Sequence, residues 1–144
     1  MTATASGEQV VNDLIDELLE QFPPTLTDAT TFLGAQFDKG LAWVHFPEGH
    51  GGLGADPTLQ RIVSARLSAA GAPHSSSRNP IGHGMAGPTL MAWGSDDQKA
   101  RYLRPTFACE GIWCQLFSEP GAGSDFAGLS SRACLLYTSD AADE

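Results

Sequence analysis

The chain has 144 residues, of which 42% are hydrophobic and 17% charged, and this composition is typical of a globular protein with a sizeable core. It excludes an intrinsically disordered chain, which would carry fewer apolar residues. Acidic residues outnumber basic ones by 17 to 8, for a formal net charge of −9 without a lysine–arginine cluster, so nucleic acids and anionic membrane surfaces are not expected partners.

Two helices are predicted at the beginning of the chain. Residues 8–22 carry one apolar stripe at helical spacing. The stripe comprises Val10, Val11, Leu14, Ile15, Leu18, Leu19 and Phe22. We expect it to pack on neighbouring helices, with binding of a partner protein as the alternative. Residues 27–40 form the second helix. Thr27 or Asp28 caps its N-terminus, and Gly40, in a left-handed conformation, ends it.

Residues 41–54 are expected to form a loop, since an apolar stretch there runs into the turn Gly51-Gly52-Leu53-Gly54. No Lys followed by Ser or Thr comes after these glycines, so the loop is not a P-loop of the Walker type. His45 and His50 have no third ligand nearby, and we therefore expect no metal site.

Three further helices are predicted before residue 110. The first runs from residue 56 or 58 to about 70, and residues 71–80, rich in turn formers, follow as a loop. Residues 81–93 form the next helix. Ser95 then begins the last helix through a capping box, and Pro105 is expected to stop it.

The most informative stretch follows these helices. Residues 112–117 have the apolar and aromatic composition of a strand. The chain then turns through Pro120, Gly121 and Gly123, with hydroxyl and carboxylate side chains between and around them. Glycines allow backbone N–H groups to come close to a ligand, and hydroxyls can donate or accept, so this turn suits a polar, planar or phosphorylated ligand.

Residues 118–128, Ser-Glu-Pro-Gly-Ala-Gly-Ser-Asp-Phe-Ala-Gly, resemble the flavin-binding motif of the acyl-CoA dehydrogenase family. Phe117 is the one departure, where the family usually has an aliphatic residue. The turn at residues 51–54 and the segment from Gly94 to Pro105 resemble the same family, residues 79–90 resemble the corresponding helix start in its bacterial members, and the order of the matches is preserved.

This resemblance implies a mainly α fold with three parts. Residues 8–110 would form the N-terminal helical-bundle domain, and residues 111–133 the first strand and flavin loop of a truncated middle β-domain. Residues 134–144 resemble the translation of an adapter used in DNA-sequencing libraries, so we expect a non-native tail outside any well-packed element; a genuine strand with an acidic tail is the alternative. Sequencing the native gene across codon 133 would distinguish the two.

The activity implied by the resemblance is the FAD-dependent oxidation of an acyl-CoA thioester to a trans-2-enoyl-CoA, in fatty acid or lipid catabolism. The cofactor-binding residues would be Gln115, Leu116, Phe117, Ser118, Gly123 and Ser124, and Ser124 would also contact the acyl-CoA. No catalytic residue is expected in this chain, because the family's base lies in a C-terminal domain. We interpret Glu119 and Asp125 as structural. His83 and Met85 would either line the acyl pocket or pack in the core.

Partners and location are also implied by the resemblance. The full-length protein would be a homo- or heterotetramer that passes electrons to electron-transfer flavoprotein. The irregularly spaced cysteines indicate reduced thiols and, without a visible secretory signal, a cytoplasmic protein. No apolar run is long enough to span a membrane. We expect the isolated chain to bind no flavin tightly and to be inactive. The alternatives are a non-catalytic partner subunit, an oxidase or related flavoenzyme, or a helical interaction module without cofactor.

Overall fold

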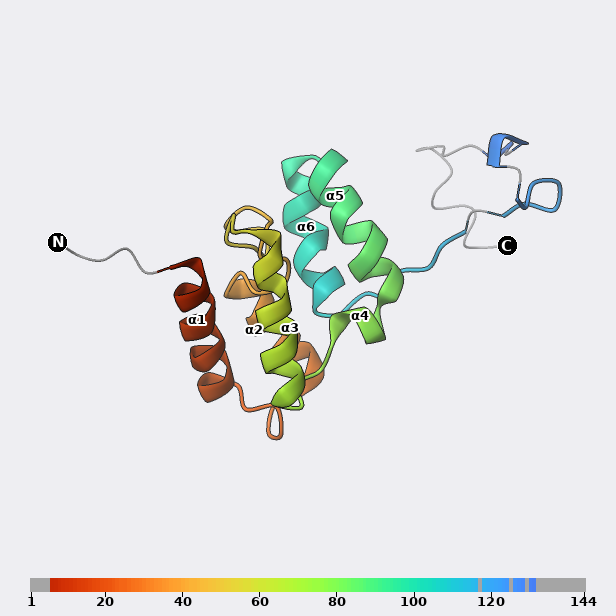
Figure 1. Ribbon diagram of the computed structural model, residues 1–144. Helices are drawn as coiled ribbons and strands as arrows, with labels where there is room; N and C mark the ends of the chain where they lie inside the picture. Colours follow the sequence, from red (N-terminus) through yellow and green to blue (C-terminus); the bar gives the residue numbers. More distant parts are fainter. Residues whose placement is uncertain (1–5, 117, 125, 129, 132–144) are drawn as a thin grey trace. The chain divides into compact units, whose positions relative to one another are not determined.

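The computed structural model describes residues 6–116, 118–124, 126–128 and 130–131 (Figure 1). The chain folds as two compact units, residues 1–114 and 115–144. Within the described ranges, every α-helix belongs to the first unit, and the second contains one 3₁₀ turn, Phe126–Gly128. The tail at residues 134–144, for which we predicted no packed element, lies outside the described residues.

The first unit is a helical domain. Its helices are α1 (Gly7–Gln21), α2 (Ala29–Asp38), α3 (Gln60–Ala69), α4 (Ser75–Arg78), α5 (Gly87–Trp93) and α6 (Asp96–Phe107). A short 3₁₀ helix, Pro57–Leu59, precedes α3, and a π-helical turn, Gly82–Ala86, runs into α5. α1 packs against α3, α2 against α6, and α5 against α6 (Figure 1). The prediction of a mainly α chain is confirmed.

The core consists of two hydrophobic clusters. The first contains Val11, Ile15, Leu18, Phe32, Ala35, Leu41, Val44, Leu59, Val63, Leu67 and Ala72. The second contains Leu33, Phe37, Ala42, Trp43, Phe46, Leu103, Phe107 and Ala108. Residues 41–46 contribute to both clusters, so the loop between α2 and α3 joins the two halves of the core. Each fully buried large side chain stabilises the fold by roughly 1.5–3 kcal/mol.

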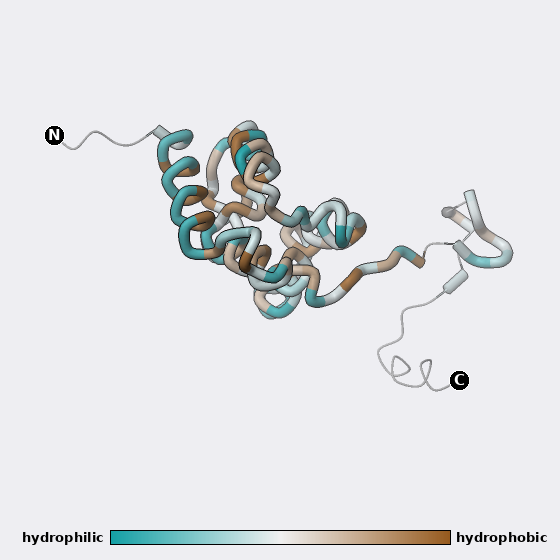
Figure 2. Tube along the Cα trace, turned by 90° about the horizontal axis from the view of Figure 1, so that it is seen from below, coloured by the Kyte–Doolittle hydropathy of each residue, from teal (hydrophilic) through white to brown (hydrophobic). Residues whose placement is uncertain are grey.

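The predicted stripe on α1 packs as expected. Val11, Ile15 and Leu18 are completely buried, whereas Val10, at the edge of the stripe, is 42% exposed. Figure 2 shows the hydrophobic residues of α1 on the side toward the other helices and the hydrophilic residues on the outer side. The stripe is therefore occupied by the protein's own core.

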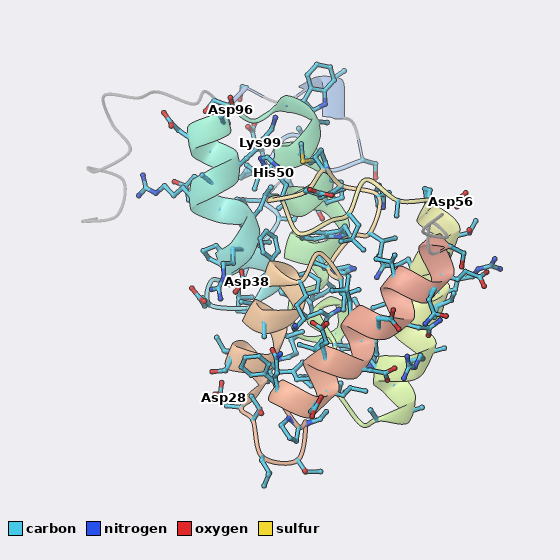
Figure 3. All side chains as sticks on the ribbon, turned by 90° about the vertical axis from the view of Figure 1, so that its left-hand side faces the viewer. Asp28, Asp38, His50, Asp56, Asp96 and Lys99 are labelled. Carbon is cyan, nitrogen blue, oxygen red and sulfur yellow. The ribbon has the colours of Figure 1, made fainter. Side chains whose placement is uncertain are left out.

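Polar side chains cap the N-termini of four helical segments. The N–H of Gln9 donates to Ser6, that of Thr31 to Asp28, and that of Thr58 to Asp56. At α6, Ser95 and Gln98 form the predicted capping box. In Figure 3, Asp28 and Asp56 lie at the beginnings of their helices and Asp96 lies in the first turn of α6. These caps satisfy backbone donors that a helix leaves free.

An arginine joins α2 to α6. Arg104 donates from Nε and Nη2 to the two carboxylate oxygens of Asp38, each at 2.8 Å, and from Nη1 to Glu110 at 3.3 Å. A Cβ atom on Gly34 would lie 2.7 Å from Nη2 of Arg104. The glycine at residue 34 therefore leaves room for the guanidinium in its present position, and a larger side chain there would require the end of Arg104 to shift.

Two predicted boundaries were wrong. Pro105 does not stop α6, which continues to Phe107. Pro105 lies in the last turn, where its missing N–H removes one hydrogen bond but leaves the turn intact. The stretch 71–80 is not all loop, because it contains the four-residue helix α4.

Two other predicted elements differ in kind. Residues 81–93 are helical, but they begin with the π-helical turn, and Pro88 lies in the first turn of α5. Residues 112–116, predicted as a strand, pair with no strand in the described part of the chain. Since a strand is defined by hydrogen bonds to a neighbouring strand, apolar composition alone did not establish one.

The helices α2 and α6 are both followed by a residue in the left-handed conformation, but the residue types differ. After α2, Gly40 has φ of 74°, as predicted. After α6, the corresponding residue is Cys109, with φ of 61°. There the N–H of Cys109 donates to the carbonyl of Thr106, and that of Glu110 to the carbonyl of Pro105, which is the Schellman pattern. A side chain in this conformation is strained, so a glycine is favoured.

We predict that Cys109→Gly raises the free energy of unfolding by up to about 1 kcal/mol, because it removes the Cβ from a left-handed conformation. Urea denaturation followed by circular dichroism measures the change. Ala108→Gly, one residue earlier in right-handed conformation, is the control and should destabilise. A lower stability for Cys109→Gly would show that packing of the thiol outweighs the backbone strain.

Candidate functional site

Asn79 is completely buried and connects distant segments through four hydrogen bonds. Its side-chain amide donates to the carbonyl oxygens of Thr106 and Gly111, both at 3.0 Å. Its Oδ1 accepts from the N–H of Gly82 at 3.2 Å and from the N–H of Trp113 at 3.0 Å. The whole donor and acceptor capacity of the amide is thus used.

The last residues of the first unit, 111–114, form an exit segment that leads toward the predicted ligand-binding turn. Besides its bond to Asn79, Trp113 donates from its indole Nε1 to Thr106 Oγ1 at 2.8 Å. Its ring lies edge-on to Tyr102, with centroids 6.4 Å apart. The exit segment has no regular secondary structure, yet these contacts fix it on α6.

Asn79 and the Trp113–Thr106 bond were not predicted from the sequence. Asn79 stands before Pro80 in a stretch full of turn residues, so local signals indicated only a loop. A buried asparagine can be recognised only when the backbone groups around it are known.

We predict that Asn79→Ala lowers the free energy of unfolding by about 3 kcal/mol, because it leaves four backbone groups without their partner, two of them buried and two part-buried. Chemical denaturation measures the loss. The control is Asn12→Ala, at a half-buried asparagine whose amide donates to the carbonyl of Glu8 and whose Oδ1 accepts from Arg66, and we expect it to cost about 1 kcal/mol. Equal losses for the two variants would contradict the role of Asn79.

The π-helical turn carries the two residues predicted to line a pocket or pack in the core. Met85 is 42% exposed, so it does not pack in the core of the described chain. His83 is half-buried and stacks on Trp43, with ring centroids 5.4 Å apart. Burial lowers the pKa of His83 below its ordinary value, so its imidazole is neutral at pH 7. The lining of a substrate pocket by either residue stays a prediction.

The glycines at residues 51–54 serve the fold. A Cβ on Gly52 would lie 2.1 Å from the carbonyl oxygen of Phe46, and Gly51 has φ of 84° and accepts at its carbonyl from Ala42 and Trp43. The glycines of this turn are therefore required by the close packing of the loop's own backbone.

In the second unit, the Gly-rich loop (residues 118–131) is closed by Glu119. The backbone groups of Glu119 and Ala122 exchange hydrogen bonds of 3.0 and 3.1 Å. The carboxylate of Glu119 accepts from the N–H and hydroxyl of Ser130, both at 3.0 Å, and from the N–H of Ser131 at 2.6 Å. The prediction that this carboxylate shapes the loop is confirmed, while Asp125 lies outside the described residues.

These bonds also determine the ionisation of Glu119. Donors from Ser131 and Ser130 lower its pKa from the ordinary value of 4.5 to about 2. A carboxylate that already accepts several hydrogen bonds and has a low pKa is a poor general base at neutral pH. Glu119 is therefore a structural residue of the loop.

The predicted ligand-binding residues lie at the surface of the second unit. Gln115, Ser118 and Ser124 are exposed, and Leu116 is 88% exposed. The turn between Glu119 and Ala122 brings Ser118 and Gly123 to its two sides. Nothing lies within 4 Å of a Cβ built on Gly123, so the packing of the described chain does not require glycine there. Phe117 lies outside the described residues.

Neither a metal-binding cluster nor a membrane-spanning helix occurs within the described residues. No group of three or more His, Cys, Asp or Glu there could hold a metal ion. No helix in the same ranges is long and apolar enough to cross a membrane.

We predict that the amide resonances of Ser130 and Ser131 titrate with a midpoint near pH 2. Because the pKa of Glu119 is depressed in the folded loop, the stabilisation is fully present above about pH 4.5 and is lost as the pH falls through 2. NMR spectra recorded over this range measure the midpoint, and Glu119→Gln should abolish the transition. A midpoint near 4.5 would refute the hydrogen bonding of Glu119.

Comparison with known proteins gives one family match and several relatives. Residues 6–110 match the family profile described as "Acyl-CoA dehydrogenase, N-terminal domain". The acyl-CoA dehydrogenase FadE34 of Mycobacterium tuberculosis is 40% identical over 97 residues, 67% of this chain and 13% of the relative. A probable acyl-CoA dehydrogenase of Bacillus subtilis is 33% identical over 135 residues, 94% of this chain and 22% of the relative.

A third relative is the caffeyl-CoA reductase-Etf complex subunit CarC of Acetobacterium woodii, 30% identical over 131 residues, 88% of this chain and 32% of the relative. The chain thus spans about a third or less of the length of these curated relatives. No solved structure matches.

Proposed function

Because the chain belongs to the acyl-CoA dehydrogenase family, we propose that it contributes the N-terminal helical domain and the flavin loop to a protein that oxidises an acyl-CoA thioester to a trans-2-enoyl-CoA. One observation carries this proposal: the similarity to the family continues from the helical domain into the Gly-rich loop. The profile covers residues 6–110, and the Bacillus subtilis relative aligns over 94% of the chain.

The chemistry of the Gly-rich loop fits an FAD molecule. Ser118 and Ser124 present exposed, neutral hydroxyl groups that can donate to the polar edge of a flavin ring. Gly123 lies between them with open space at its Cβ position, so a ligand can approach its backbone. Gln115 and Leu116 offer a side-chain amide and an exposed apolar surface, and Phe117 completes the proposed set.

When bound, FAD would accept the hydride that leaves the β-carbon of the acyl chain. The chain's own residues would bind and orient. Ser118 would hydrogen-bond the ring edge, Ser124 would contact both cofactor and acyl-CoA, and Glu119 would keep the loop in shape while ionised. Among the described residues we assign no catalytic base, since the carboxylate in the loop is already occupied.

We propose electron-transfer flavoprotein as the electron acceptor, a tetrameric assembly and a cytoplasmic location. The name of the CarC relative, a subunit of a complex with Etf, supports the first of these. That name also contains the word reductase. The relatives of this chain therefore include proteins named for reduction of an acyl-CoA as well as proteins named for its oxidation. A non-catalytic subunit of a heteromeric dehydrogenase is the second candidate, and the residue at the family's base position, in the C-terminal domain of the full-length protein, would distinguish the two.

To test the proposal, the protein encoded by the native gene should be purified and its flavin absorbance measured. We predict that Ser118→Ala and Ser124→Ala each weaken FAD affinity about 2- to 10-fold, as expected for one neutral hydrogen bond of about 0.5–1.5 kcal/mol. Thr25→Ala, at an exposed hydroxyl in the turn after α1, is the matched control and should leave affinity unchanged.

Two results would count against the assignment. A protein purified without flavin that fails to take it up would favour a helical interaction module. Binding of FAD that none of the loop variants affects would place the cofactor elsewhere. Formation of an enoyl-CoA product by the flavin-loaded protein would distinguish the dehydrogenase from the non-catalytic subunit.

A further inference from the structure

One face of the helical stretch from Gly82 to Trp93 is exposed and almost entirely apolar. Its exposed residues recur at helical spacing, and one hydroxyl is the only polar group among their side chains. The residues of this set, which we call the α5 face, are Gly84, Met85, Pro88, Thr89, Ala92 and Trp93.

The large side chains of the α5 face are left open to solvent by the described chain. Trp93 is 86% exposed and Met85 is 42% exposed. No Asp, Glu, Lys or Arg occurs between residues 79 and 94, although the whole chain has a net charge of −9. Contiguous exposed apolar surface without charged residues is typical of a binding surface. The α5 face therefore has the chemistry of an interface.

The α5 face is complementary to a second copy of itself when the two helices meet antiparallel. In a twofold symmetric pair, each contact between two residues occurs twice, once in each direction. In one register, Gly84 of one copy lies opposite Trp93 of the other. The same register sets Met85 opposite Ala92. A Cβ built on Gly84 meets nothing within 4 Å, so there is open space to receive the indole ring. Large side chains thus oppose small ones, as in well-packed helix pairs.

The charges at the two ends of this helical stretch favour the antiparallel arrangement. The helix α4, which ends at Arg78, lies at one end, and the start of α6, with Asp96 and Asp97, lies at the other (Figure 1). Neither Arg78 nor Asp97 forms an ion pair with another described residue. An antiparallel pair brings Arg78 of each copy toward the acidic end of the other, whereas a parallel pair would bring like charges together.

We propose that the α5 face binds a second copy of the chain and forms a twofold symmetric dimer with antiparallel α5 helices. A standard interface uses about 20–30 residues from each partner, far more than the α5 face supplies, so the dimer should dissociate at low protein concentration. The proposal concerns the helical domain and does not rest on FAD binding, so a failure of either would leave the other standing.

Sedimentation equilibrium of the whole chain over a range of concentrations tests the dimer. The average mass should rise with concentration from 15.2 kDa toward twice that value. Trp93→Glu should keep the chain at the mass of a monomer, because it places a charge in an apolar interface. Leu26→Glu is the matched control and should dimerise like the wild type, since Leu26 is also 86% exposed but lies in the turn after α1.

Two further variants test the register and the charges. Gly84→Leu fills the space that the indole ring would enter and should weaken dimerisation roughly 10-fold. A surface that associates without a register would instead gain affinity from the added leucine. Arg78→Glu should weaken dimerisation about 2- to 5-fold at low salt. Its control is Arg61→Glu, at an exposed arginine of α3, which should leave dimerisation unchanged.

Three results would overturn the proposal. A chain that stays monomeric at every concentration would leave the α5 face to another occupant, such as an acyl chain or a further part of a longer polypeptide. A dimer that persists in Trp93→Glu would place the interface elsewhere. Association that Gly84→Leu strengthens would refute the antiparallel register.

Discussion

The helical domain depends on the buried amide of Asn79. Burying such a group is unfavourable unless every donor and acceptor finds a partner, and here backbone groups from the π-helical turn, α6 and the exit segment supply all four. The π-helical turn is separated in sequence from α6 by α5, and the exit segment follows shortly after α6. One side chain thus bonds to all three segments, and it helps to hold the exit segment in place without a helix or sheet.

The loop between α2 and α3 has a comparable role in the apolar part of the fold. Trp43 stacks on Phe46 and contacts Phe37 and Phe107, while Val44 packs in the other cluster. Backbone groups in this loop bond to one another and to the side chain of Gln60, which accepts from the N–H of Val44. Buried loops need such partners, and the glycines at residues 51–54 make the close backbone approach geometrically feasible.

Local signals predicted much of this domain. Apolar periodicity and capping residues located α1, α2, α3 and α6, because both depend on neighbours within a few positions. The error at Pro105 arose because a proline in the last turn of a helix removes one hydrogen bond without ending the helix. At α4 and the π-helical turn, the turn-forming and small residues did not reveal the kind of helix that forms. Asn79 could not be predicted at all, since its partners lie 27 to 34 residues away along the chain for three of its four bonds.

For the candidate site, the sequence predicted the position of the loop but not its contacts with a ligand. The resemblance located the Gly-rich loop, and the structural role of Glu119 followed from its position beside glycines. The contacts of Ser118, Gly123 and Ser124 with a cofactor stay predictions, because a ligand's position depends on surfaces that composition does not reveal. Residues 112–116 show the same limit, since a strand requires a partner that the segment itself cannot supply.

The contact between Arg104 and Gly34 has an evolutionary consequence. The guanidinium occupies part of the space that a larger residue 34 would need, so a side chain at residue 34 requires the end of Arg104 to shift. Such a shift would disturb the bonds of Arg104 to Asp38 and Glu110. Substitutions at these four sites should therefore be non-additive. Among homologous domains, the residues at positions 34 and 104 should therefore covary.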